Sequence, residues 1–70
     1  MTNLQRIRKE RGLTQAALAQ AAGINARMLA FYDNGYRSIN GAAAETVIRI
    51  ADALGCDPRE LMDKEGEKDE

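Results

Sequence analysis

The feature that most constrains the fold of this chain is a pair of short helical segments separated by only three residues. Thr14 is an N-cap for the first segment, and Gly23 can adopt the left-handed conformation that ends it. Asn25 is the N-cap of the second segment, which runs to about Asn34 and stops at Gly35. Short helices joined by so tight a turn cross at about 90–120°, which predicts a helix-turn-helix.

The residues around this turn suit a sharp crossing of the two helices. Ala19 lies four residues before Gly23, and its small side chain lets the first helix approach the second closely. Ile24, Leu29 and Tyr32 supply the apolar wedge that sets the angle between the helices. In this arrangement the outer face of the second helix can enter a DNA major groove.

Start and stop signals predict further helices on both sides of this pair. Thr2 followed by Gln5 fits a capping box, in which each side chain bonds the other residue's backbone N–H, and Gly12 closes the first helix. Asn40 is the expected cap of a fourth helix, which ends near Leu54.

The C-terminal part of the chain completes the bundle. Asp57 and Glu60 are expected to cap a fifth helix, with Pro58 at its first position, where a missing N–H costs nothing. The sequence therefore predicts an all-α, compact five-helix domain over residues 1–64, followed by an acidic, disordered tail over residues 65–70. Apolar residues of the fourth helix repeat at the spacing of a buried stripe: Val47, Ile50, Ala51 and Leu54.

The net charge of −1 hides two halves of opposite sign. Residues 1–40 hold six basic and two acidic residues, a net of +4, whereas residues 41–70 hold four basic and nine acidic residues, a net of −5. Such polarity suggests that the first half faces a nucleic acid and the second half faces something else. A mixed, solvated surface that happens to be polarised is the equally open alternative.

Composition argues against several classes of function. The chain has no histidine and one cysteine, Cys56, so it lacks the residues for a histidine-based catalytic site, a zinc site or an internal disulfide. We therefore expect no enzyme activity, no metal and no cofactor, and Cys56 is expected to be a small buried residue. No apolar run approaches the roughly 20 residues of a membrane span, so no membrane partner is expected. A lone thiol suits a cytoplasmic location.

The ordered set of motifs resembles the Cro/Xre, lambda-repressor-like helix-turn-helix family over residues 4 to 62. The resemblance implies a five-helix bundle whose third helix reads bases. It also implies a homodimer that binds palindromic double-stranded DNA and regulates transcription, most often as a repressor. The matching residues are Gly12-Leu13-Thr14-Gln15, Leu18-Ala19, Gly23-Ile24-Asn25, Leu29, Tyr32-Asp33-Asn34-Gly35, Glu45-Thr46, Ile50-Ala51-Asp52-Ala53-Leu54-Gly55-Cys56 and Glu60-Leu61-Met62.

Carried over by position, the resemblance implies DNA contacts from the second and third helices. Gln15 would contact a phosphate at the start of the second helix, and Asn34 and Arg37 would contact the backbone just beyond the third. Arg8 and Asp33 match a pair that joins the first helix to the end of the third. The expected DNA-binding residues are Gln15, Asn25, Ala26, Arg27, Ala30, Phe31, Asn34 and Arg37.

The third helix departs from the family pattern because it offers few hydrogen-bonding groups to a base. Arg27 could bind guanine O6 and N7, while Ala26 and Ala30 could contact a thymine methyl group. DNA shape and deformability could then supply much of the specificity. A solvated charge is the plainer role for Arg27, and Phe31 could contact DNA, the domain's own surface or a partner.

A second function from another class stays open at this point. Met28, Ala30 and Phe31 could form an apolar patch that docks a protein partner, and an antitoxin-like protein could bind both DNA and a partner. Tyr36 likewise has two roles: its hydroxyl could approach a phosphate, or its ring could cover Ile39.

Overall fold

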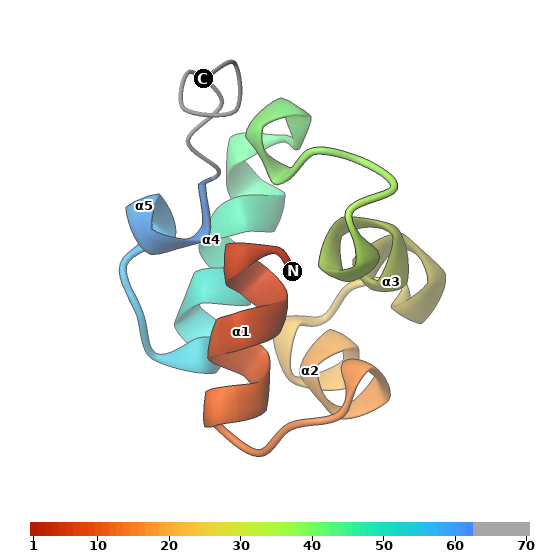
Figure 1. The fold of residues 1–70 in the computed structure, drawn as a ribbon, viewed down its shortest axis with the longest axis vertical. Helices are drawn as coiled ribbons and strands as arrows, with labels where there is room; N and C mark the ends of the chain where they lie inside the picture. Colours follow the sequence, from red (N-terminus) through yellow and green to blue (C-terminus); the bar gives the residue numbers. More distant parts are fainter. Residues whose placement is uncertain (63–70) are drawn as a thin grey trace.

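The computed structural model describes residues 1–62, and these fold into a bundle of helices without a strand (Figure 1). The all-α architecture with five α-helices expected from the sequence is therefore confirmed. The predicted domain boundary at residue 64 and the predicted tail over residues 65–70 lie outside the described residues. The elements are α1 (Asn3–Glu10), α2 (Gln15–Ala22), α3 (Ala26–Asn34), the 3₁₀ helix η1 (Ile39–Gly41), α4 (Ala44–Leu54) and α5 (Pro58–Leu61).

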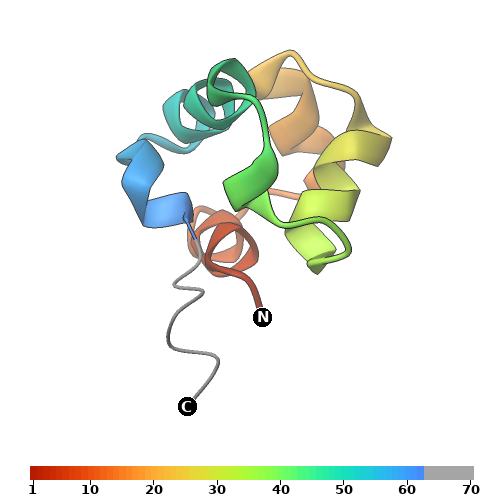
Figure 2. The ribbon, with the colours of Figure 1, turned by 90° about the horizontal axis from the view of Figure 1, so that it is seen from above.

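The helices surround one apolar core, and α3 lies at its edge. Helix α2 packs against α3 and α4, α5 packs against α4 and α1, and α1 also contacts α3. Figures 1 and 2 show α3 and α5 at opposite sides of the bundle in both views. One long face of α3 is thus left uncovered by the other helices. The largest fully buried apolar side chains are Leu4, Leu18, Leu29, Ile50 and Leu61.

The ends of α2 and α3 form as local chemistry predicts. The Thr14 hydroxyl accepts the backbone N–H of Ala17 at 3.0 Å, and the Asn25 side-chain oxygen accepts the N–H of Arg27 at 2.8 Å. Gly23 has φ +71°, a left-handed conformation that costs an L side chain about 1–2 kcal/mol but is open to glycine. These signals fix the bounds of both helices and the three-residue turn between them.

The predicted capping box of the first helix is only half right. The Thr2 hydroxyl does accept the backbone N–H of Gln5 at 3.0 Å. The Gln5 amide, however, does not return to the backbone of Thr2 but donates to the carboxylate of Asp33 at 3.1 Å. A charged acceptor in a neighbouring helix forms the stronger hydrogen bond and takes this donor.

The predicted cap of the fourth helix is wrong. Asn40 lies in η1, which is capped by the hydroxyl of Ser38, and its backbone N–H donates to that hydroxyl at 3.1 Å. Helix α4 begins later, at Ala44, and its N-cap Ala43 makes no side-chain cap hydrogen bond. The buried stripe on this helix is confirmed, because Val47, Ile50, Ala51 and Leu54 are all buried.

The fifth helix carries the capping box that the sequence predicts. The Glu60 carboxylate accepts the backbone N–H of Asp57 at 3.0 Å, and the Asp57 side chain closes the reciprocal contact. The side-chain amide of Asn3 donates to the carbonyl of Met62 at 2.8 Å. This contact ties the end of the described chain to the start of α1.

Candidate nucleic-acid interface

Asp33 is the point at which α1, α2 and α3 are joined. Its carboxylate is fully buried and accepts two hydrogen bonds from Arg8, at 2.8 and 3.2 Å. It accepts further bonds from Gln15 at 2.8 Å and from Gln5 at 3.1 Å. The predicted pair of Arg8 and Asp33 is therefore confirmed, with two glutamines added to it.

These donors decide the charge of Asp33. Burial alone would raise the pKa of the carboxyl group, because a low dielectric disfavours the charged form. Hydrogen bonds from Arg8, Gln15 and Gln5 outweigh burial and hold the pKa of Asp33 below its usual value. The carboxylate is consequently ionised at neutral pH and fixes α3 from its inner side.

The outer face of α3 brings together most of the residues expected to contact DNA. At 100° per residue, roughly 140° of the helix surface is covered by Ala26, Arg27, Ala30, Phe31 and Asn34. Near the two ends of the helix, Ala26, Arg27 and Asn34 are exposed, and in its middle Ala30 and Phe31 are half-buried. Leu29, Tyr32 and Asp33 face inward. The outer face of α3 consists of Ala26, Arg27, Ala30, Phe31 and Asn34.

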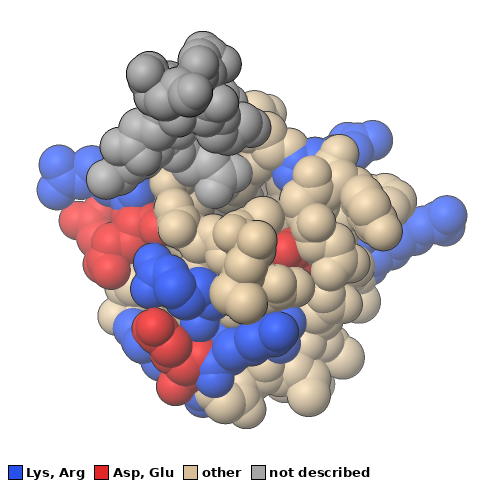
Figure 3. Space-filling model, viewed as in Figure 1, with Lys and Arg blue, Asp and Glu red and all other residues tan. Residues whose placement is uncertain are grey.

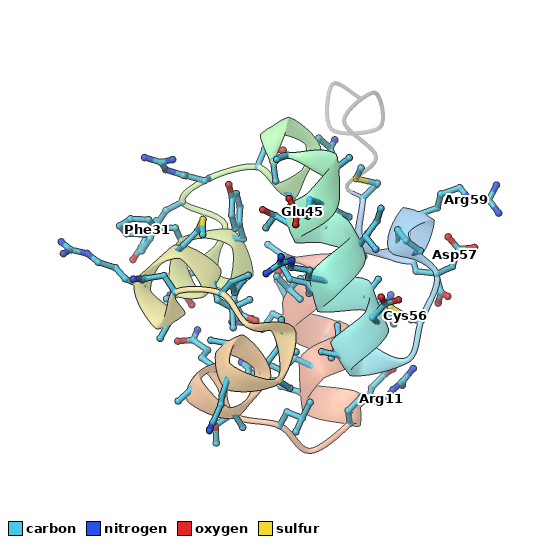
Figure 4. All side chains as sticks on the ribbon, turned by 180° about the vertical axis from the view of Figure 1, so that it is seen from behind. Arg11, Phe31, Glu45, Cys56, Asp57 and Arg59 are labelled. Atoms are coloured by element: carbon cyan, nitrogen blue, oxygen red, sulfur yellow. The ribbon has the colours of Figure 1, made fainter. Side chains whose placement is uncertain are left out.

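Arg37 joins this face because the chain folds back after α3. Its backbone N–H donates to the carbonyl of Phe31 at 3.1 Å, and its guanidinium lies over the Phe31 ring, 5.7 Å from the centroid. Tyr36 meets the same ring edge to face, with centroids 6.4 Å apart and an interplanar angle of 68°. Figure 4 shows Phe31 at the outer side of α3, far from α5.

The other two residues expected to contact DNA, Gln15 and Asn25, use their side chains for hydrogen bonds within the protein. The Gln15 amide nitrogen donates to Asp33 and also approaches the Asn34 oxygen at 3.3 Å. The Asn25 side-chain oxygen accepts the backbone N–H groups of Arg27 and Met28. The side chain of Gln15 therefore braces α2 against α3, and that of Asn25 caps α3.

Charge on this side of the molecule is positive. Between Arg11 and Ala44 the sequence contains one carboxylate, Asp33, and it is buried and paired with Arg8. The helix-turn-helix itself therefore presents no exposed carboxylate, although the exposed Glu45 of α4 lines a groove beside its turn. Figure 3 shows basic side chains projecting beyond α3, while acidic side chains gather on the side of α5 and the lower end of α1.

Two arginines differ from the others in having no acidic partner. Of the seven arginines, five lie within 4.0 Å of a carboxylate in the described part of the chain: Arg6, Arg8, Arg11, Arg49 and Arg59. Arg27 and Arg37 form no ion pair with any of residues 1–62. Both stand on or beside the outer face of α3, where an unpaired guanidinium is available to a phosphate or a base.

Sequence reasoning missed three contacts at this site. The hydrogen bonds from Gln5 and Gln15 to Asp33 were not expected, because no local sequence pattern indicates a hydrogen bond between residues of different helices. Tyr36 is 77% exposed and packs on Phe31, a contact that neither expected role of this tyrosine anticipated. Met28, Ala30 and Phe31 are each half-buried, and Met28 also packs against the apolar core.

Residues 1–62 form neither a metal-binding cluster nor a helix that could cross a membrane. Residues 1–62 contain no group of three or more acidic, histidine or cysteine side chains placed to hold a metal ion. None of their helices has the length and apolar character to cross a membrane.

Cys56 is half-buried beside the core, and burial together with Glu60 and Asp57 raises the pKa of its thiol despite the opposing charge of Arg11.

Comparison with known proteins agrees with this geometry. A family model described as helix-turn-helix matches residues 4–61. The chain is similar to the restriction-modification controller protein C.AhdI from Aeromonas hydrophila, whose crystal structure superposes with a TM-score of 0.75. That likeness covers 86% of each chain at 28% sequence identity, and no curated protein sequence gave a match. This protein belongs to the Cro/C1-type helix-turn-helix family of DNA-binding domains.

Proposed function

We propose that this protein is a sequence-specific regulator of transcription, a repressor that acts as a homodimer on a palindromic operator. The observation that carries the proposal is that Arg27 and Arg37 form no ion pair within residues 1–62 and lie on or beside α3, a helix whose single carboxylate, Asp33, is buried. The family match and the similarity to a restriction-modification controller protein support DNA binding and regulation rather than an enzymatic role.

Base recognition would come from α3 in the major groove. Arg27 is the exposed hydrogen-bond donor on the first two turns of the outer face, and its planar fork matches guanine O6 and N7. Ala26 and Ala30 allow the helix to approach the bases closely and can contact thymine methyl groups. Because few side chains here can read a base directly, we infer that DNA shape contributes to specificity.

Phosphate contacts would flank this helix on both sides. Arg37 and the amide of Asn34 lie at the C-terminal end of α3, within reach of one strand. At the start of α2 the Gln15 side chain is held by Asp33, so the backbone N–H groups of that helix are the stronger candidates for a phosphate. Asn25 would act by fixing the first turn of α3, whose residues meet the bases.

A dimer would form through the half of the molecule opposite α3. Ile48 on α4 and Met62 after α5 are large apolar residues that are 49% and 37% exposed, respectively. Covering them with a second copy would stabilise a two-fold pair. Such a pair can place two α3 helices about 34 Å apart, one turn of DNA, which a palindrome requires. Repression would follow from occupying a promoter in the cytoplasm.

The test is selection of bound sequences from random duplex DNA at physiological salt, followed by binding measurements on the selected duplex. We expect a palindromic site, and we expect Arg27→Ala to cost about 1–3 kcal/mol and to relax the preference at one base pair per half-site. Arg59→Ala, which removes an exposed arginine of α5, is the matched control and should bind normally. Failure of the wild-type protein to prefer any duplex would refute the proposal.

Dimerisation is tested separately by sedimentation equilibrium. We expect Ile48→Glu to shift the protein toward monomer and to weaken binding to the palindrome more than to a single half-site. Gln20→Ala changes an exposed residue of α2, outside the proposed dimer surface, and should leave the association unchanged. A wild-type protein that is monomeric both free and on the palindrome would overturn the dimer.

A further inference from the structure

Phe31, Tyr36 and Arg37 form one assembly at the end of α3, here called the Phe31 cluster. We propose that the cluster is a clamp for a backbone phosphate of DNA. In it Phe31 is a positioning residue that holds the guanidinium of Arg37, and the Tyr36 hydroxyl donates to the same strand. The inference rests on the proposed function and gives Phe31 a role at the DNA backbone instead of a contact with a base.

The backbone after α3 is shaped to build this cluster. Gly35 has φ +85°, and its N–H donates to the carbonyl of Tyr32 at 3.3 Å. The N–H of Arg37 then donates to the carbonyl of Phe31 at 3.1 Å, which closes the helix and turns the chain back along it. Arg37 is thereby placed beside a ring that lies six residues earlier in the sequence.

The contact between Arg37 and Phe31 orders the guanidinium without consuming its donors. A cation over an aromatic ring is attracted by the π electrons, and here the Cζ atom of Arg37 is 5.7 Å from the ring centroid. The N–H donors of the guanidinium stay free for oxygen ligands. No carboxylate of residues 1–62 competes for Arg37. Ordering before binding reduces the entropy lost when the side chain meets a phosphate.

Contacts already made by the Phe31 ring argue against a base-reading role. One face of the ring lies under Arg37, and the ring meets Tyr36 edge to face at 6.4 Å. Tyr36 is itself 77% exposed, so its ring is supported by Phe31 while most of the residue faces solvent. A phenol held in this way can donate its O–H to a phosphate oxygen.

A double-mutant cycle on the selected duplex tests the clamp. We expect Arg37→Gln to lower the slope of log affinity against log salt by about 0.9 per protomer, because one phosphate contact is lost. We expect Phe31→Leu alone to weaken binding by roughly 2- to 5-fold per protomer, the size of an exposed cation–π contact. In the Arg37→Gln background, Phe31→Leu should have a clearly smaller effect, because only its support of the Tyr36 ring remains to be lost.

Two variants separate positioning from simple packing. Phe31→Tyr keeps the aromatic face and should restore binding, and Tyr36→Phe should weaken binding without changing the salt slope. Repeating the selection with Phe31→Leu should recover the wild-type sequence preference. Thermal unfolding of each variant shows whether the fold is intact, and Arg37→Gln tests the phosphate contact even if Phe31→Leu unfolds.

Three results would overturn the clamp while leaving the proposed function intact. These are an unchanged salt slope in Arg37→Gln, equal effects of Phe31→Leu in both backgrounds, and an altered sequence preference in Phe31→Leu. If the wild-type protein prefers no duplex sequence, the proposed function itself is refuted.

Discussion

The side-chain amide of Gln15 donates a 2.8 Å hydrogen bond to the carboxylate of Asp33, so the first residue of α2 holds α3 from inside the protein. The family resemblance assigns Gln15 to a phosphate. In the structure its amide nitrogen faces Asp33 and Asn34 instead. The same residue thus helps to fix the orientation of α3 before any DNA is present.

The first prediction concerns the stability that this contact provides. Gln15→Ala should destabilise the fold by about 1.5–3 kcal/mol, the range for a hydrogen bond to a charged group. It should not change the salt slope of DNA binding, since no charge is removed. Urea unfolding measures the first effect, with the exposed Gln20→Ala of the same helix as control. A Gln15→Ala protein of unchanged stability but weakened DNA binding would instead support a phosphate contact for Gln15.

The buried ion pair should matter far more than a surface pair. Asp33→Ala leaves Arg8 without its partner in a buried site, and we expect a loss of about 3–5 kcal/mol. Glu45→Ala breaks an exposed pair in which Glu45 lies 2.7 Å from Arg49, and we expect a loss below about 1 kcal/mol. Urea unfolding at neutral pH compares the two, and losses of equal size would contradict this prediction.

Stability should fall in acid partly because of Asp33. Its pKa in the folded protein lies below that of the unfolded chain, which is about 3.9. The folded state therefore gains stability from Asp33 above about pH 4 and loses it as the pH falls through the lower, folded pKa. The stability difference between wild type and Asp33→Asn should shrink below pH 4 in urea unfolding series. A constant difference down to pH 2 would exclude this role of Asp33.

Two glycines should respond in opposite ways to a methyl group. Gly23→Ala places a side chain at φ +71° and should cost about 1–2 kcal/mol, although the new Cβ would meet only the Arg49 guanidinium, at 3.7 Å. Gly41→Ala has open space and no positive φ, and should stabilise by about 0.4–1 kcal/mol. Thermal unfolding should show shifts of opposite sign, each of several degrees.

The helix ends could be predicted from the sequence wherever a side chain marks them. Thr14, Asn25 and Asp57 each cap a helix through a hydrogen bond to a residue only two or three positions away, so the signal is local. The start of α4 lacks such a mark, because Ala43 provides no cap. Asn40 was the nearest polar candidate, whereas the N-cap is Ala43, so the prediction was wrong by three residues.

The site was less accessible to prediction because its key contacts join distant segments. The pair of Arg8 and Asp33 followed from the family resemblance, but the bonds from Gln5 and Gln15 span 28 and 18 residues. Such contacts depend on how helices pack, which no local pattern encodes. The assignment of individual residues to DNA stays a prediction.

The two faces of α3 separate the residues that hold the helix from those proposed to read DNA, within a single stretch of nine residues. Leu29 and Asp33 are fully buried and anchor the helix, while Ala26 and Arg27 are exposed and Ala30 is half-buried. Duplicated genes for such a domain can therefore diverge toward new target sites by changing outward side chains alone. A laboratory can retarget the domain in the same way, without redesigning the bundle that carries it.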